Sequence, residues 1–378
     1  MKAIVVGAGP GGATAARLLA RAGAEVRLFE KSVWPREKTC GDGISPLGIR
    51  ELAQTGLTVS GRVHLERALV STPGGTSFRG GWPAETPWGT TIARREFDAQ
   101  LVDAAIAAGA AFEPNTPVTK IAAGADAVSV AVRSGETERT LAGDVAIVAE
   151  GATGGLASAL DFPRFRSRLL AIRGYVESAK PLDPEYGLFY ERGLSPGYGW
   201  IFPMDARHAN VGICIDERRL KRGGGNLREL LRSWLDRSPF VRELLGTSLA
   251  MTVVHGGIIP TGRKVRSAPR VLLIGDAAGV ADPFTAEGIF EAIHSARLAA
   301  DALTTGAFPD AAARYERSLA VFDRNERTAR AMRATFGLAI EPYARRAARD
   351  PAFAGRLNTD VFFLKPSFTG FVRNLMRA

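Results

Sequence analysis

The sequence predicts an α/β fold with a parallel sheet built from discontinuous segments, a second domain based on an antiparallel sheet, and C-terminal helices. Three observations lead to this fold class. A glycine-rich turn follows the first apolar strand, strands with period-two alternation dominate residues 169–260, and a short apolar run at 271–274 has the pattern of a buried parallel strand. The last run returns the chain to its first domain.

The first strand, residues 3–6, leads into a G-x-G-x-x-G turn made by Gly7, Gly9 and Gly12. Gly7 permits a tight turn from strand to helix, and Gly9 lets backbone N–H groups approach a pyrophosphate. Gly12 lets the following helix pack closely on the sheet. Between a strand and a helix, this turn predicts a Rossmann-type dinucleotide-binding unit.

A helix is expected over residues 10–22, and its N-terminus would place partial positive charge beneath that pyrophosphate. The second strand, residues 25–29, is followed by Glu30, whose carboxylate can accept both ribose hydroxyls of an adenosine. The sequence has no second G-x-G-x-x-G behind a strand. One dinucleotide is therefore expected to be held permanently, which favours a bound flavin over a nicotinamide dehydrogenase.

The domain boundaries follow from where the pattern changes. The chain is expected to leave the first domain in the segment 69–88, which is rich in Gly, Pro and Trp. The strands with period-two alternation, which indicate a sheet with one covered face, form most of the second domain. Long helices are expected over 227–245, 286–304 and 311–338. The predicted nucleotide-binding domain comprises 1–68, 91–165 and 256–325, the predicted substrate-binding sheet domain 69–90 and 166–255, and the C-terminal helical segment 326–378.

Composition excludes several classes of function. With 46% hydrophobic and 23% charged residues, the 378-residue chain is typical of globular proteins. The net charge of +10 comes from scattered basic residues without long runs, so we expect no nucleic-acid binding. Two cysteines form neither a disulfide framework nor a metal pattern, and no apolar run is long enough to span a membrane. These features predict a cytoplasmic enzyme without a metal site.

A later segment resembles the second FAD motif of flavoproteins with the p-hydroxybenzoate hydroxylase fold. It begins with Gly275 and Asp276 and continues through Pro283 to Gly288. The resemblance implies FAD as the cofactor, with Asp276 holding its ribityl chain and with Pro283 and Gly288 beside the isoalloxazine. Arg94 matches an arginine that commonly lies near the FAD pyrophosphate.

Two further segments are similar to motifs of the geranylgeranyl reductases, namely the Cys-Gly segment at residues 35–43 and the Y-x-W-x-F-P motif at 198–203. In that family FAD, reduced by NAD(P)H or another reductant, saturates isolated C=C bonds of polyprenyl chains. The resemblance therefore implies an FAD-dependent oxidoreductase whose partner is an apolar small molecule.

The aromatic residues of the second motif alternate along a strand. Tyr198, Trp200 and Phe202 therefore point to one face, where they would line an apolar tunnel over the flavin. A core aromatic stripe is the alternative. Cys40 could donate a proton or sense redox state, although free cysteines are commonly small buried hydrophobes. We predict Cys40, Tyr198 and Trp200 as catalytic residues and Phe202 as part of the substrate pocket.

Other functions stay open at this point. A flavin monooxygenase that hydroxylates or epoxidises shares the fold, and a flavin-carrying electron-transfer protein ranks third. Flavin halogenases share a W-x-W-x-I motif and need a lysine near the substrate. A halogenase is therefore disfavoured, because position 198 is Tyr and no lysine occurs between Lys38 and Lys120. An isoprenoid, a quinone or a secondary metabolite would fit an apolar tunnel. The tail at 360–378 mixes aromatic residues with cations, which predicts peripheral membrane contact. Docking of the tail onto its own domain is the alternative.

Overall fold

The computed structural model describes residues 1–378 except 84–85, 87, 196, 248 and 360–378. Its first sheet has the strand order β18-β19-β12-β1-β2-β8 and is parallel apart from the edge strand β18. The strands are β1 (Lys2–Val6), β2 (Glu25–Phe29), β8 (Ala111–Glu113), β12 (Val145–Val148), β18 (Ser267–Ala268) and β19 (Val271–Leu273). The predicted return of the chain to its first domain is confirmed, because β19 pairs with β12.

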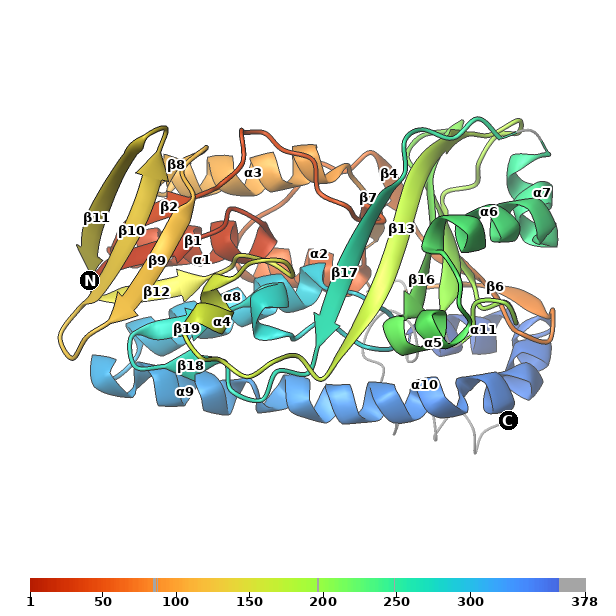
Figure 1. The fold of residues 1–378 in the computed structure, drawn as a ribbon. Coiled ribbons are helices and arrows are strands. Elements are labelled where there is room, and N and C mark those ends of the chain that lie inside the picture. The colour runs from red at the N-terminus through yellow and green to blue at the C-terminus, as the bar shows by residue number, and fades with distance from the viewer. Residues whose placement is uncertain (84–85, 87, 196, 248, 360–378) are drawn as a thin grey trace.

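Helices pack around this sheet (Figure 1), and the first of them follows the glycine-rich turn. Helix α1 (Pro10–Arg21) packs against α3 (Arg94–Ala107) and α8 (Ile289–Thr304). The shorter elements are α2 (Pro46–Gln54), α4 (Leu156–Ala159), α9 (Ala311–Ser318) and the 3-10 turns η1 (Gly275–Ala278) and η2 (Phe308–Asp310). Helix α8 begins at Ile289 rather than at residue 286, since Gly288 is its N-cap.

Two small sheets flank the first one. Strands β9 (Val118–Ala123), β10 (Val128–Ser134) and β11 (Thr137–Gly143) form an antiparallel sheet at the left of Figure 1. Strands β3 (Gly43–Ile44), β4 (Val63–Leu65) and β7 (Gly89–Thr91) form the other. The chain passes through this small sheet on its way to the second large sheet and again on its return.

The second large sheet has seven strands in the order β17-β13-β16-β15-β14-β5-β6. They are β5 (Arg67–Ser71), β6 (Ser77–Gly81), β13 (Ser167–Glu177), β14 (Glu185–Phe189), β15 (Tyr198–Pro203), β16 (His208–Asp216) and β17 (His255–Thr261). One pairing, β14 with β5, is parallel, so the sheet is mixed rather than wholly antiparallel. Strand β17 belongs to this sheet, although the predicted nucleotide-binding segment began at residue 256.

Both faces of this sheet are covered, so the prediction of one covered face was wrong. Helices α6 (Leu227–Arg237) and α7 (Pro239–Leu245) pack on one face; the single helix predicted there is divided where Ser238 caps α7. Helix α10 (Ala320–Ala347) covers part of the other face, and α11 (Pro351–Leu357) packs against β6. The remaining helix, α5 (Glu217–Arg222), follows β16.

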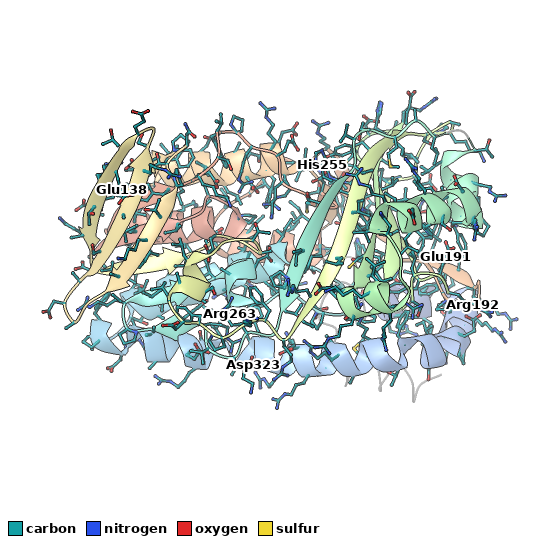
Figure 2. The ribbon with its side chains drawn as sticks, viewed as in Figure 1. Glu138, Glu191, Arg192, His255, Arg263 and Asp323 are labelled. Atoms are coloured by element: carbon teal, nitrogen blue, oxygen red, sulfur yellow. The ribbon has the colours of Figure 1, made fainter. Side chains whose placement is uncertain are left out.

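Helix α10 runs along the lower edge of both large sheets in Figure 1. Asp323 near its start, labelled in Figure 2, pairs with Arg266 at 2.8 Å, which joins the helix to the first domain. Its later residues reach the apolar cluster of the second domain. The single helix predicted over 311–338 is divided into two in the structure, α9 (Ala311–Ser318) and α10, and α10 extends beyond the predicted end. None of the helices in the described part of the chain combines the length with the apolar composition that a membrane span requires.

Candidate functional site

A cavity of about 770 Å³ lies where the carboxyl ends of the parallel strands face the seven-stranded sheet. In open α/β sheets this edge is where ligands bind. The sequence-predicted site residues in its wall are Gly7, Gly9, Glu30, Cys40, Arg94, Tyr198, Trp200, Phe202, Gly275, Asp276 and Gly288. Residues predicted from motifs as distant as 7 and 288 thus share one cavity.

Two predicted cofactor residues lie elsewhere. Gly12 packs α1 against the β1 turn, since a Cβ there would lie 1.8 Å from the Gly7 carbonyl oxygen. Pro283 lines a separate hollow of about 20 Å³, and its carbonyl accepts a hydrogen bond from Arg333 Nη1 at 2.8 Å. The cavity is lined from Thr285 onward in this segment, and the position of Pro283 beside the cofactor stays a prediction.

The glycine-rich turn has the geometry that the sequence predicts. Gly7 adopts φ +100°, a backbone conformation that residues with a side chain rarely adopt. A Cβ there would lie 2.3 Å from the Ala149 carbonyl oxygen. Gly9 is the N-cap of α1, with Pro10 at the first helical position. The N-terminus of α1 therefore faces the cavity with backbone N–H groups and partial positive charge.

Glu30 is held in place by three donors. Its carboxylate accepts hydrogen bonds from the Ala8 N–H at 3.1 Å, the Ser32 N–H at 3.0 Å and Arg36 Nε at 3.2 Å. A carboxylate offers about four acceptor positions. One position is thus left to accept a ribose hydroxyl in the cavity.

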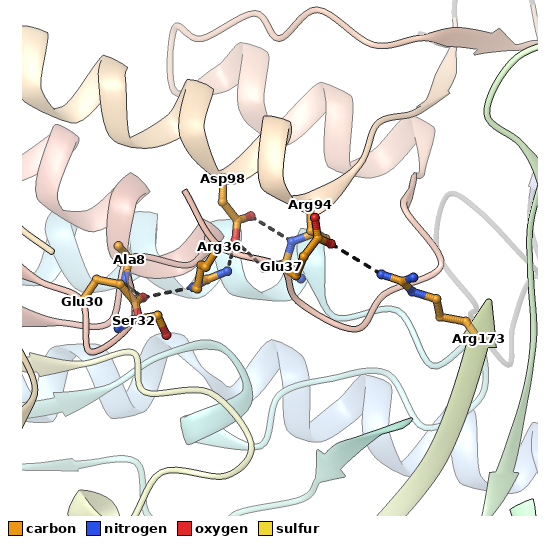
Figure 3. Close-up of polar contacts among 8 residues, drawn as sticks. All are labelled: Ala8, Glu30, Ser32, Arg36, Glu37, Arg94, Asp98 and Arg173. Atoms are coloured by element: carbon orange, nitrogen blue, oxygen red, sulfur yellow. Dashed lines mark hydrogen bonds and ion pairs between the residues drawn. The ribbon is translucent and has the colours of Figure 1, made fainter. Parts of the chain in front are cut away.

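Two guanidinium groups converge on Gly9. Arg94 makes a bidentate pair with Asp98, with both N–O distances 2.8 Å, and Arg36 Nη1 donates to the same carboxylate at 2.8 Å. Figure 3 shows Asp98 between the two arginines, with Arg36 reaching to Glu30. A Cβ on Gly9 would lie 3.5 Å from Arg36 Nη2 and 4.0 Å from Arg94 Nη2.

This cluster is a candidate anion site at the start of α1. Asp98 is fully buried and pairs with both arginines, and Glu30 also pairs with Arg36, so two carboxylates balance the two guanidinium groups. Burial alone would lower the pKa of Arg94, but the attraction of Asp98 outweighs burial and raises it, so the guanidinium stays charged. The guanidinium N–H groups beside Gly9 and the N-terminus of α1 are suitable donors for a pyrophosphate. The sequence analysis did not identify Arg36, although the Cys-Gly segment contains it.

The second FAD motif places Asp276 in the cavity wall. Burial raises the pKa of this carboxyl, while the charges of Lys38 and Arg94 oppose the rise. Hydroxyl groups of a ribityl chain are suitable donors for such a carboxylate. With the spare acceptor of Glu30 and the arginine pair at Gly9, the residues present fit FAD from its adenosine to its ribityl chain.

The aromatic residues of β15 share one face of the strand, as predicted. Tyr198, Trp200 and Phe202 line the cavity, whereas Ile201 belongs to the apolar cluster on the opposite face. Neighbouring rings of the three lie 6.2 and 6.3 Å apart between centroids. Trp200 Nε1 donates to Asn210 Oδ1 at 2.9 Å, so this indole is fixed in orientation. The three rings form an aromatic wall.

The Cys-Gly segment lies against the aromatic wall. A Cβ on Gly41 would be 3.2 Å from Trp200 Nε1, and a Cβ on Gly43 would be 3.1 Å from the Phe202 ring. Larger residues at either position would therefore crowd the rings. Cys40 precedes them in the cavity wall, and burial raises the pKa of its thiol.

A buried polar network that the sequence analysis missed holds this segment. Asp42 is fully buried with φ +60, and its Oδ2 accepts from Tyr175 OH at 2.5 Å and from Asn210 Nδ2 at 2.8 Å. Asn210 Nδ2 also donates to the Cys40 carbonyl at 2.9 Å. Since Asn210 accepts from Trp200 as well, the network couples the Cys-Gly segment to the aromatic wall.

Residues 1–308 match the family model described as the FAD binding domain. Over 320 residues the chain is 32% identical to the menaquinone reductase of Mycobacterium tuberculosis, covering 79% of this chain and 76% of that protein. Over 318 residues it is 30% identical to the digeranylgeranylglycerophospholipid reductase of Methanoculleus marisnigri, covering 79% and 75%.

Among solved structures, a geranylgeranyl bacteriochlorophyll reductase-like protein from Thermoplasma acidophilum superposes with a TM-score of 0.84 at 19% identity. The match covers 99% of this chain and 95% of that one. The flavin-dependent halogenase CmlS gives a TM-score of 0.72 at 22% identity, covering 100% and 70%. At these identities the two structures establish the fold alone. The match to the family model and the identity to the reductases establish that this chain belongs to the FAD binding domain family, as an FAD-dependent oxidoreductase of the geranylgeranyl reductase-like group.

Proposed function

We propose that this enzyme uses reduced FAD to saturate a C=C bond of an apolar, isoprenoid-like substrate. The observation that supports this function best is that the aromatic wall and the FAD-binding residues line the same cavity. Leu188, Ile258 and Ile259 add further apolar surface to it. The names of the two relatives point to a quinone and to a geranylgeranyl lipid as the classes of substrate.

When bound and reduced, FAD would supply the hydride chemistry that the reduction of a C=C bond needs. The protein must then hold the alkene, exclude water and provide a proton for the second carbon. Tyr198, Trp200 and Phe202 would hold the apolar chain by contact with their rings. Cys40, which lines the same cavity, stays a predicted catalytic residue. NAD(P)H or another reductant would reduce the flavin.

Anaerobic single-turnover kinetics test the proposal. The FAD-loaded protein is reduced with dithionite and mixed with geranylgeraniol in the absence of oxygen, and flavin absorbance is followed by stopped flow. A reductase reoxidises its flavin and yields a product with two more hydrogen atoms, which mass spectrometry detects. Reoxidation only after oxygen is added, with an oxygenated product, would instead establish a monooxygenase, and no response to either would indicate an electron carrier.

Peripheral membrane contact is a separate part of the proposal. The tail that predicts it, residues 360–378, lies outside the described residues. Its aromatic and cationic composition suits a lipid surface from which an apolar substrate could be taken up.

A further inference from the structure

One acid in the cavity has no role in the function proposed so far. Glu287 lines the cavity just before Gly288, the N-cap of α8. Ser45 Oγ donates a hydrogen bond to Glu287 Oε1. Ser45 is also the N-cap of α2, where its Oγ accepts from the Gly48 N–H at 3.1 Å. The carboxyl group therefore lies at the N-terminus of α2, whose partial positive charge favours the carboxylate form.

The same acid lies next to the aromatic wall. Tyr198 OH donates to the Thr285 carbonyl at 2.5 Å, which ties the segment carrying Glu287 to β15. Tyr186 from β14 lines the cavity as well, and the rings of Tyr186 and Phe202 lie 5.1 Å apart. Glu287, which belongs to the second FAD motif, thus lines the same cavity as the surface proposed to hold the substrate.

The groups around Glu287 set the pKa of its carboxyl close to neutral pH. Burial raises its pKa to about 7, the Ser45 hydrogen bond opposes the rise, and the charge of Asp282 adds to it. Glu291, in the first turn of α8, feels the charge of Glu287, as do Tyr186 and Tyr198. A general acid works best when its pKa is near the working pH.

Two other proton donors of the cavity, Cys40 and Tyr198, are weaker acids. Burial raises the pKa of the Cys40 thiol above its usual value near 9. Burial also raises the pKa of Tyr198 well above its ordinary value, and its hydroxyl proton is engaged by the Thr285 carbonyl. Of these three groups, Glu287 gives up a proton most readily at neutral pH.

We propose that Glu287 is the catalytic acid that protonates the substrate, an inference that rests on the proposed function. The double bond accepts a hydride, with both electrons, at one carbon and the Glu287 carboxyl proton at the other. Two C–H bonds replace the π bond, and Glu287 is left as a carboxylate that Ser45 stabilises by its hydrogen bond. Water restores the proton after the product leaves.

The test compares three variants by anaerobic single turnover with geranylgeraniol. Glu287→Gln is expected to lower the rate of alkene-dependent flavin reoxidation by about 10²- to 10⁴-fold, the usual contribution of a general acid. Glu291→Gln is the matched control, because it removes a second buried acid of raised pKa that lines the separate small hollow. It should retain the rate within a few fold. Cys40→Ser tests the competing acid.

The pH profile distinguishes catalysis from structural support. The acid must be protonated to react, so the single-turnover rate of the unmodified enzyme should fall as pH rises through about 7. The Glu287→Gln variant should be slow and independent of pH over that range. A Glu287→Gln variant with the full rate, or a pH dependence abolished by Cys40→Ser alone, would overturn the inference while leaving the proposed function intact.

A spectroscopic measurement needs no turnover. The infrared C=O band of a protonated carboxyl group should disappear as the FAD-loaded protein is titrated through neutral pH, and Glu287→Gln should lack that band. If Glu287→Gln does not fold, the titration of the unmodified protein and a Ser45→Ala variant, whose band should disappear at higher pH, replace it. An unmodified enzyme that yields no reduced product would overturn both the proposed function and this inference.

Discussion

Replacing Gly12 with alanine is expected to weaken both the fold and FAD binding. The new Cβ would lie 1.8 Å from the Gly7 carbonyl oxygen and 3.2 Å from Ala149 Cβ. An ordinary contact needs at least 3.4 Å, and the closer atom belongs to the backbone, which cannot rotate away. To restore an ordinary contact, the first turn of α1 must move away from the β1 turn by about 1.6 Å, the difference between 3.4 and 1.8 Å.

Two opposing free energies decide the outcome of Gly12→Ala. Alanine is better than glycine in a helix by about 1 kcal/mol, which would stabilise the variant. Overpacking of a close contact costs about 1–3 kcal/mol and occasionally more. Because this contact involves backbone on both sides, we expect a net loss of about 2 kcal/mol in the free energy of unfolding. The N-terminus of α1 moves too, so the FAD affinity should fall at least about tenfold, or 1.4 kcal/mol.

Urea denaturation of the FAD-free protein measures the first effect, and fluorescence titration with FAD measures the second. Gly193→Ala is the matched control, because a Cβ at Gly193 meets nothing within 4 Å and its φ is not positive. It should match the unmodified protein in both assays. If Gly12→Ala were as stable as Gly193→Ala and bound FAD equally well, the close packing of α1 on the β1 turn would be refuted.

Four further perturbations test other parts of the structure. Asp98→Asn leaves two arginines without their shared buried carboxylate and should cost about 3–5 kcal/mol in urea denaturation; a loss within error would contradict that role. Trp200→Phe leaves the Asn210 acceptor unpaired and should cost about 1–3 kcal/mol by the same assay. The pKa of Glu287 is about 7 in the folded state against an ordinary 4.5. Between these two pH values the folded state binds more protons than the unfolded state, so the free energy of unfolding falls as pH rises through that range. Glu287→Gln should make the melting temperature less dependent on pH there, and an unchanged slope would argue against the raised pKa. Deleting residues 362–378 should lower binding to anionic liposomes in a flotation assay, whereas unchanged binding would reject membrane contact through the tail.

Local patterns predicted much of the fold and part of the candidate site. The apolar strand, its glycines and the following acid lie within thirty residues, so their spacing alone indicates a nucleotide-binding turn. Alternation along β15 likewise predicts that its three aromatic rings share a face, because side chains in a strand alternate between faces. These inferences needed only neighbours in the chain.

Contacts between distant segments could not be predicted in this way. Ser45 and Glu287 are separated by 242 residues, and Asp42 and Tyr175 by 133, so no spacing pattern links the members of either pair. The covering of both faces of the seven-stranded sheet also depends on α10 crossing from one domain to the other.

The sequence by itself determined the cofactor class and the strand–turn–helix unit that binds it, because glycine, acid and apolar residues act there through local backbone geometry. Only the tertiary structure decided which titratable side chains face the cavity. Burial and neighbouring charges set the pKa of a carboxyl group, and both arise only when segments far apart in the chain pack together.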